Sequence, residues 1–316
     1  MNNNIQIIFA TDNNYAPHIG IALVSLLENS NKNTLYSVNI LEDGSVDSEN
    51  KKKIISLSNN RLIINFIIIN DNEFKKYYSR KHISSTAYYR FLIPEIFRNI
   101  NKVIYSDPDV LFLKDLTQLW NIDLKNKPLG LVPCLATKFI KNEFIKKHEK
   151  LSIPNEYEYC YDGNMLMDLS KLRELNFKEK VLKIASENNF ENGDMDAINK
   201  CFFKEFCYLE QQWTYWPAIE EILIQLSIKK INNKDEFLKN KKNFQEAGKR
   251  PGIIHFAGAI KPWHYMYPEN HYKKLYWKYI KKSPWHNKFS YLSAPDFNLK
   301  HFIKKEIINR INSISK

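Results

Sequence analysis

The chain has 316 residues, enough for a large α/β core with an appendage, and its 44% hydrophobic and 14% aromatic content excludes a largely disordered protein. No apolar run approaches the roughly 18 residues of a membrane span, and Met1-Asn2-Asn3-Asn4 lacks the features of a signal peptide, so we expect a cytoplasmic protein. The formal net charge of +12 is unevenly placed, which argues against a general excess of lysine as its origin.

Short β-like runs alternate with helix-like segments, a pattern typical of an α/β fold with a mostly parallel central sheet flanked by helices. We predict strands over 5–10, 35–41, 62–69 and 103–106, a helix beginning at Pro17, and a helix over 47–58. Ligands in such sheets bind beyond the carboxyl ends of the strands, which places the segments 11–14 and 107–109 on one rim. The chain has only eight glycines and no Gly-rich phosphate loop, which disfavours Rossmann dehydrogenases and P-loop enzymes.

Asp107-Pro108-Asp109 stands between two apolar runs, where a buried strand emerges. Side chains at i and i+2 of an extended segment point the same way, and Pro108 keeps the residue before it extended, so both carboxylates can converge on one ion. Mg²⁺ or Mn²⁺ would suit them, together with a nucleotide diphosphate. The alternative is a solvated Asp-Pro turn that ends the strand.

A second cluster, residues 255–264, follows the apolar pair Ile253-Ile254. A neutral imidazole at His255 can ligate a metal, Gly258 allows close approach of the backbone to a phosphate, and Lys261 supplies a compact positive charge. Taken singly, these residues could equally be a hydrogen-bonded histidine, a turn glycine and a solvated lysine.

The C-terminal end is strongly basic. Residues 271–316 hold eleven Lys or Arg against two acids, which gives +9 and leaves +3 for the other 270 residues. Between Lys300 and Lys316, isoleucines recur at helical intervals among basic residues, a pattern that suits an anionic membrane surface. A helix packed on the body through its isoleucines is an equal alternative, and nucleic acid ranks lowest because no nucleic-acid-binding module is present.

Four segments together resemble, in order and spacing, the family 8 glycosyltransferases, especially the bacterial lipopolysaccharide core glucosyl- and galactosyltransferases. They are residues 9–15, 85–90, 105–111 and 255–264, and Ser283-Pro284-Trp285 is similar to the C-terminal extension of that subgroup. The resemblance implies the GT-A fold and retaining transfer of glucose or galactose from a UDP-hexose to a lipopolysaccharide or lipooligosaccharide core acceptor. It also implies a catalytic domain over 1–265 and a basic, aromatic-rich extension over 266–316.

The resemblance further implies roles for individual residues. Asp107, Asp109 and His255 would hold Mn²⁺ or Mg²⁺ against the UDP diphosphate, which Gly258 and Lys261 would also bind. Arg90 would reach the donor sugar and phosphate region, and Asp194 and Asp196 match the two acids of a motif whose first acid contacts the donor sugar. The uridine and ribose pocket would be lined by Ala10, Asp12 and Asn14.

The sequence departs from the family pattern near the donor sugar. Tyr161-Asp162-Gly163 stands where the family has Asn, a small residue and Gly, and Met195 replaces a Gln. Asp162 is a candidate for a compensating role, either holding a sugar hydroxyl or facing the anomeric carbon, and a loop acid is the alternative. Retaining transfer could use a carboxylate nucleophile or attack of the acceptor on the face that UDP leaves, and we favour the second route.

Two hypotheses of different class follow. The first is an active transferase, peripheral at the inner face of the cell membrane, that acts on a lipid-linked or other oligosaccharide acceptor. The second is a sugar-nucleotide-binding protein without transferase activity, which the changes at Tyr161, Asp162 and Met195 suggest. Retention of the two carboxylates, the histidine and the lysine of a leaving-group site favours the enzyme.

Overall fold

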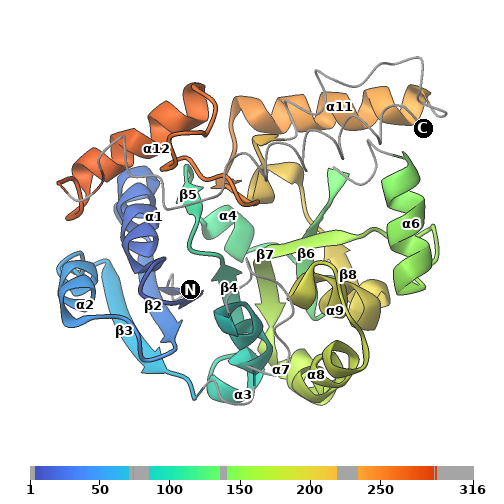
Figure 1. The fold of residues 1–316 in the computed structure, drawn as a ribbon. Helices are drawn as coiled ribbons and strands as arrows, with labels where there is room; N and C mark the ends of the chain where they lie inside the picture. The colour runs from blue at the N-terminus through green and yellow to red at the C-terminus, as the bar shows by residue number, and fades with distance from the viewer. Residues whose placement is uncertain are drawn as a thin grey trace.

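The structure is a computed structural model that describes residues 4–70, 85–135, 141–218 and 234–287, together with Phe74 and Phe289. Its centre is a seven-stranded sheet in the order β3-β2-β1-β4-β7-β6-β8, and β5 and β9 form a separate two-stranded sheet (Figure 1). The strands are β1 (Asn4–Thr11), β2 (Leu35–Glu42), β3 (Leu62–Ile68), β4 (Lys102–Ser106), β5 (Val110–Phe112), β6 (Leu129–Pro133), β7 (Cys160–Asp168), β8 (Phe206–Tyr208) and β9 (Ile253–His255).

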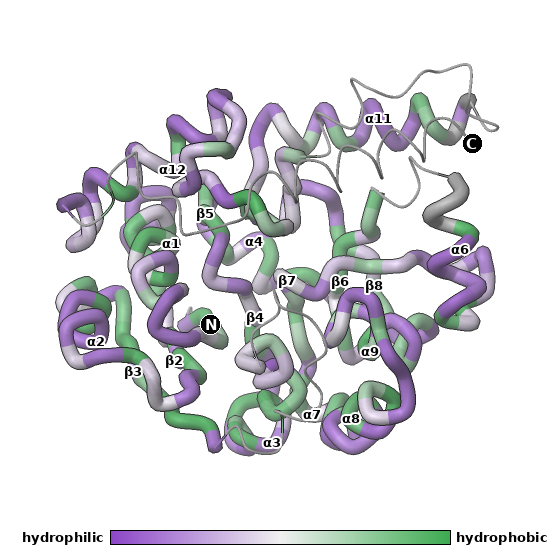
Figure 2. The backbone as a smooth tube through the Cα atoms, viewed as in Figure 1, coloured by the Kyte–Doolittle hydropathy of each residue, from purple (hydrophilic) through white to green (hydrophobic). Residues whose placement is uncertain are grey.

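Helices lie on both faces of the central sheet. The α-helices described are α1 (Ala16–Asn29), α2 (Ser48–Ile55), α3 (Ile93–Ile96), α4 (Thr117–Trp120), α6 (Lys141–Leu151), α7 (Leu169–Glu174), α8 (Phe177–Glu187), α9 (Gly193–Phe202), α11 (Lys234–Lys249) and α12 (His271–Lys282). Short 3₁₀ helices are η3 (Ser85–Leu92), η4 (Phe203–Glu205) and η5 (Gln211–Thr214). Figure 2 shows α2, at the outer edge, as mostly hydrophilic, whereas α1 beside the sheet carries hydrophobic turns.

The predicted mostly parallel sheet is confirmed. β1 pairs in parallel with β2 and β4, β2 with β3, and β6 with β8. Only β7 runs against its neighbours, pairing antiparallel with β4 and β6. All four predicted strands and both predicted helices are present with boundaries close to those expected, and Asp47 caps α2 by accepting a hydrogen bond from the Asn50 amide at 2.7 Å.

The central strands are buried because both of their faces are covered. Along β1, Ile7 and Phe9 belong to one hydrophobic cluster, whereas Ile8 and Ala10 belong to the cluster on the other face. This division follows from the alternation of side chains along a strand. Because β1 and β4 are parallel, their carboxyl ends lie at the same edge of the sheet. The chain becomes polar there, at Asp12 and Asp107.

Helix α12 packs against α1 beside the sheet (Figure 1). Ile21 of α1 and Tyr276 of α12 share a third hydrophobic cluster, and Glu28 of α1 pairs with Lys278 at 3.0 Å and Lys282 at 2.5 Å. The basic segment predicted over 300–316 lies outside the described residues. Among the described helices, none is both long and apolar enough to cross a membrane.

Candidate functional site

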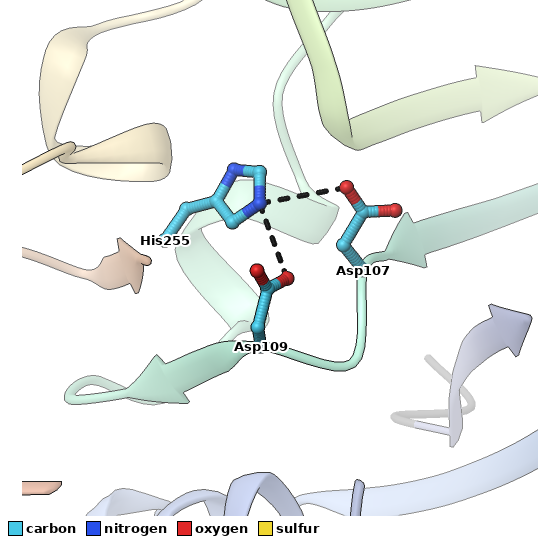
Figure 3. A group of neighbouring side chains, drawn as sticks. All are labelled: Asp107, Asp109 and His255. Atoms are coloured by element: carbon cyan, nitrogen blue, oxygen red, sulfur yellow. Dashed lines mark ion pairs between the residues drawn. The ribbon is translucent and has the colours of Figure 1, made fainter. Parts of the chain in front are cut away.

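Asp107, Asp109 and His255 meet because of two strand pairings. The first two residues lie on the short connection from β4 to β5, and β5 pairs with β9 so that Val110 lies opposite His255. A backbone bond from the Phe256 amide to the Asp109 carbonyl, 2.9 Å, extends this pairing to the aspartate. The His255 Nε2 atom lies 3.4 Å from Asp107 Oδ2 and 3.3 Å from Asp109 Oδ1 (Figure 3).

This group can hold a metal ion. One ligand atom from each of the three residues lies within 4.8 Å of the other two, and Asp109 and His255 are buried. Carboxylate oxygens with an imidazole nitrogen are a donor set that suits Mn²⁺, and carboxylates also suit Mg²⁺. Burial is the largest single influence and lowers the pKa of His255, but the Asp109 and Asp107 carboxylates together outweigh it, so the net shift is upward. The negative charge that attracts a proton here would equally attract a divalent cation.

Gly163 of β7 makes room for this group. A Cβ atom at position 163 would lie 2.7 Å from both Asp107 Oδ2 and His255 Nδ1, and closer still to His255 Cε1. The Gly163 carbonyl also accepts a hydrogen bond from the Asp107 amide at 2.7 Å. At position 163 the backbone therefore lies close to the candidate ligands. Any residue larger than glycine would crowd Asp107 and His255.

Lys261 adds a buried cation next to Asp109. Its Nζ atom donates to Asp109 Oδ2 and, at 2.9 Å, to the carbonyl oxygen of Phe256. Burial alone would raise the pKa of Asp109, but Lys261 and His255 lower it well below its usual range, while Asp109 raises the pKa of Lys261 against the effect of burial. Both groups are thus charged at neutral pH, which suits Lys261 to phosphate oxygens.

Arg90 of η3 is the hub of the neighbouring region. Its guanidinium lies 2.7 Å from Asp107, 2.7 Å from Asp162 and 3.0 Å from Asp194, and it is almost fully buried. Its Nε also donates to the Ala87 carbonyl and its Nη1 to the Asp162 carbonyl, both at 2.9 Å. One side chain thereby joins β4, β7 and α9 at the carboxyl edge of β4.

The region around Arg90 and the candidate metal ligands contains more carboxyl groups than permanent cations. In the described part of the chain, Asp107, Asp109, Asp162 and Asp194 face only Arg90 and Lys261 as permanent cations. Burial raises the pKa of Asp162 well above its ordinary value and also raises that of Asp194, although Arg90 opposes both shifts. A divalent cation bound beside Asp107 would favour the ionised forms of these carboxyl groups.

The loop after β1 lies close to Lys261. Ala10 is buried at the end of β1, and Asp12 Oδ1 accepts hydrogen bonds from the amides of Asn14, at 2.9 Å, and Tyr15, at 3.1 Å. The Tyr15 ring centroid is 6.0 Å from Lys261 Nζ, so this loop and the 255–264 segment are neighbours. Gly258 has φ of +94° and open space where a Cβ would project.

Two predicted positions lie elsewhere. Asp196 is fully buried, and its carboxylate accepts from Tyr159 at 2.5 Å and from Lys147 at 3.1 Å. Met195 is half-buried against a hydrophobic cluster. These contacts hold α9 in place, so Asp196 supports the helix that carries Asp194.

Sequence reasoning did not single out Tyr105 or Gly163. The Tyr105 hydroxyl donates to Asp107 Oδ1 at 2.8 Å, and its ring lies 4.6 Å from the Arg90 guanidinium. Its place two residues before Asp107 was the available signal, because side chains at i and i+2 of a strand share a face.

Comparison with known proteins identifies the family of the chain. Residues 6–267 match the profile described as glycosyl transferase family 8. Among curated proteins, the chain is 27% identical to general stress protein A of Bacillus subtilis, over 89% of this chain and 94% of that protein. It is 24% identical to lipopolysaccharide 1,2-glucosyltransferase of Escherichia coli K12, over 89% of this chain and 79% of that protein. Among solved structures, the galactosyltransferase LgtC in complex with donor and acceptor sugar analogues superposes with a TM-score of 0.75 at 21% identity, covering 92% of this chain and 98% of that one.

Proposed function

Because the chain belongs to glycosyltransferase family 8, we propose that it is a metal-dependent, retaining hexosyltransferase that moves glucose or galactose from a UDP-sugar to a lipopolysaccharide or lipooligosaccharide core acceptor. The observation that carries this proposal is the group of Asp107, Asp109 and His255 beside the buried Lys261. Such a group is suited to a diphosphate leaving group, because departure of UDP concentrates negative charge on phosphate oxygens.

Asp107, Asp109 and His255 would hold Mn²⁺ or Mg²⁺, which supplies counter-charge to the diphosphate when bound. Lys261 would then exchange part of its contact with Asp109 for a phosphate oxygen, and Gly258 would let the backbone approach the same group. In the loop near Lys261, Ala10, Asp12 and Asn14 would line the uridine and ribose pocket. All of these residues lie at the edge to which the β1 and β4 carboxyl ends point.

The donor sugar would lie beside Arg90, Asp162 and Asp194. Arg90 holds both carboxylates in fixed positions, so they can accept hydrogen bonds from particular sugar hydroxyls. For retention, we favour attack of the acceptor hydroxyl on the face from which UDP departs. The C1–O bond to UDP breaks, the new C1–O bond forms, and the acceptor proton passes to the departing phosphate. Neither carboxylate is then required as a nucleophile.

The acceptor and the cellular location extend the proposal. The basic residues of 266–316 would hold this extension against the anionic inner face of the cell membrane, beside a lipid-linked oligosaccharide, while 1–265 would form the catalytic domain. The charge of +9 over 271–316 supports this division, as does the name of the E. coli relative.

The test is release of UDP from a panel of UDP-sugars, with Mn²⁺ and with EDTA, in the wild type and in Asp109→Ala. We expect one hexose donor to be turned over, only with metal, and the variant to lose at least about 100-fold in rate. Equal UDP affinity in EDTA and in Mn²⁺ would contradict the metal assignment. Metal-dependent UDP binding without turnover of any donor, with the core acceptor present, would favour a sugar-nucleotide-binding protein.

A further inference from the structure

Trp285 lies beyond the residues that match the family, yet it is inserted into the body of the protein. It is fully buried between α1 and α2, and Lys53 Nζ lies 6.0 Å from its ring centroid. Its ring packs on Gly20 of α1, where a Cβ atom would lie 3.1 Å from Cε3 and closer still to two other ring atoms. Glycine destabilises the interior of a helix, so its presence at position 20 needs a reason. Here it leaves the space that the Trp285 ring occupies.

The indole N–H begins a chain of hydrogen bonds toward the loop after β1. Trp285 Nε1 donates to Asn50 Oδ1 at 2.8 Å, and Asn50 Nδ2 donates to Asn13 Oδ1 at 2.8 Å. An indole nitrogen can only donate, so the Asn50 oxygen must face Trp285 and its NH₂ group must face Asn13. The indole therefore holds the oxygen end of the Asn50 amide, while Asp47 Oδ2 accepts a second bond from Asn50 Nδ2 at 3.3 Å.

Asn13 is then fixed within its loop. Its Oδ1 also accepts from the Asp47 amide at 3.1 Å, its Nδ2 donates to Asp47 Oδ2 at 3.0 Å, and its backbone amide donates to Ser45 Oγ at 3.0 Å. Asn50 is itself buried, with 1% of its surface exposed, so water does not compete for its bonds. The residues on either side of Asn13 are Asp12 and Asn14.

We propose that Trp285 is a positioning residue for the nucleotide-binding loop, acting through Asn50 and Asn13. This inference rests on the proposed function, because it takes Asp12 and Asn14 as the uridine and ribose contacts. The C-terminal segment thereby supports the donor site indirectly, through the loop after β1. Removing the indole N–H leaves the buried Asn50 oxygen without its donor, which weakens the hold of Asn50 on Asn13 and makes the loop less ordered before the nucleotide arrives.

The experiment compares UDP with inorganic pyrophosphate, both in Mn²⁺, by calorimetry on the full chain. Pyrophosphate would use the metal and Lys261 but not the loop after β1. We expect Trp285→Phe to weaken UDP binding by about fivefold, the worth of one ordinary hydrogen bond, and to leave pyrophosphate binding within about twofold of the wild type. Asn50→Ala should have the same effect, and the double variant should be no weaker than Asn50→Ala alone. In the donor reaction, KM should rise while kcat stays near the wild-type value.

Leu119→Ala is the matched control, since Leu119 is buried in the same hydrophobic cluster and makes no contact with this chain of bonds. It should lower thermal stability without changing UDP affinity. Wild-type UDP affinity in both Trp285→Phe and Asn50→Ala would overturn the inference, as would equal loss of UDP and pyrophosphate binding. If Trp285→Phe does not fold, Asn50→Ala alone decides between these outcomes. Failure of the wild type to bind UDP in Mn²⁺ would instead refute the proposed function.

Discussion

Gly163→Ala should damage the candidate metal site while leaving the fold intact. The added methyl group would lie 2.7 Å from Asp107 Oδ2 and from His255 Nδ1, whereas real Cβ atoms essentially never come within 3.0 Å of another heavy atom. Asp107 must therefore move by at least the difference, about 0.3 Å, and His255 by more, because its Cε1 would lie closer still to the methyl group. Metal–ligand distances tolerate about 0.2 Å. The backbone at position 163 does not have a positive φ, so alanine adds no strain of its own there.

We expect Mn²⁺ affinity to fall by about 10- to 100-fold, as it does when groups that orient metal ligands are changed. Titration of Mn²⁺ followed by electron paramagnetic resonance measures this directly, and circular dichroism reports the fold. Gly130→Ala is the matched control, because its methyl group would be crowded to 2.8 Å by Leu124 but not by any candidate ligand. Wild-type Mn²⁺ affinity in folded Gly163→Ala would refute the assignment of these residues as ligands.

Four further results are expected. Asp194→Asn should reduce turnover far more than UDP affinity, because a sugar-facing carboxylate is not a nucleotide contact; equal effects on both would show a misassignment. Mn²⁺ affinity should fall as the pH drops through the raised pKa of His255, because imidazolium cannot ligate, and a calorimetric series flat with pH would contradict this. Arg90→Lys should lower the free energy of unfolding in denaturant by roughly 3 kcal/mol, because a compact ammonium lacks the planar fork of donors with which Arg90 contacts three carboxylates; a loss below about 1 kcal/mol would be inconsistent with these buried contacts. Truncation after Ser293 removes five basic residues and should weaken sedimentation with anionic vesicles while UDP-sugar hydrolysis stays near normal; undiminished sedimentation would exclude a membrane role for that segment.

The first half of the fold was predictable because its signals are local. The strands β1 to β4 are short apolar runs bounded by polar residues, and Pro17 and Asp47 mark the starts of helices in ways that depend on backbone chemistry alone. β7 was not predicted. Its segment contains Asp162, Gly163 and Asn164, which disfavour a strand, and only burial between β4 and β6 makes it one.

The residues of the candidate site could be predicted from the sequence, but the contacts between them could not. Spacing along the chain indicated that Asp107 and Asp109 share a face, and both do lie near His255. The sequence did not indicate that Arg90 would join three carboxylates, because that requires β4, β7 and α9 to meet. The loss of a Gln at Met195 is explained no further by the structure, which shows a half-buried side chain against the core.

The pairing of β5 with β9 also bears on how the protein is made. Asp107 and Asp109 leave the ribosome long before His255 and Lys261, because about half of the chain separates the two groups. Domains fold as the chain emerges, so the sheet around β1 and β4 can form while β5 still lacks its partner. A nascent or prematurely ended chain therefore contains Asp107 and Asp109 without His255 or Lys261. Its candidate metal site is incomplete. Under the proposed function, a complete donor site therefore forms only after both β9 and Lys261 have left the ribosome.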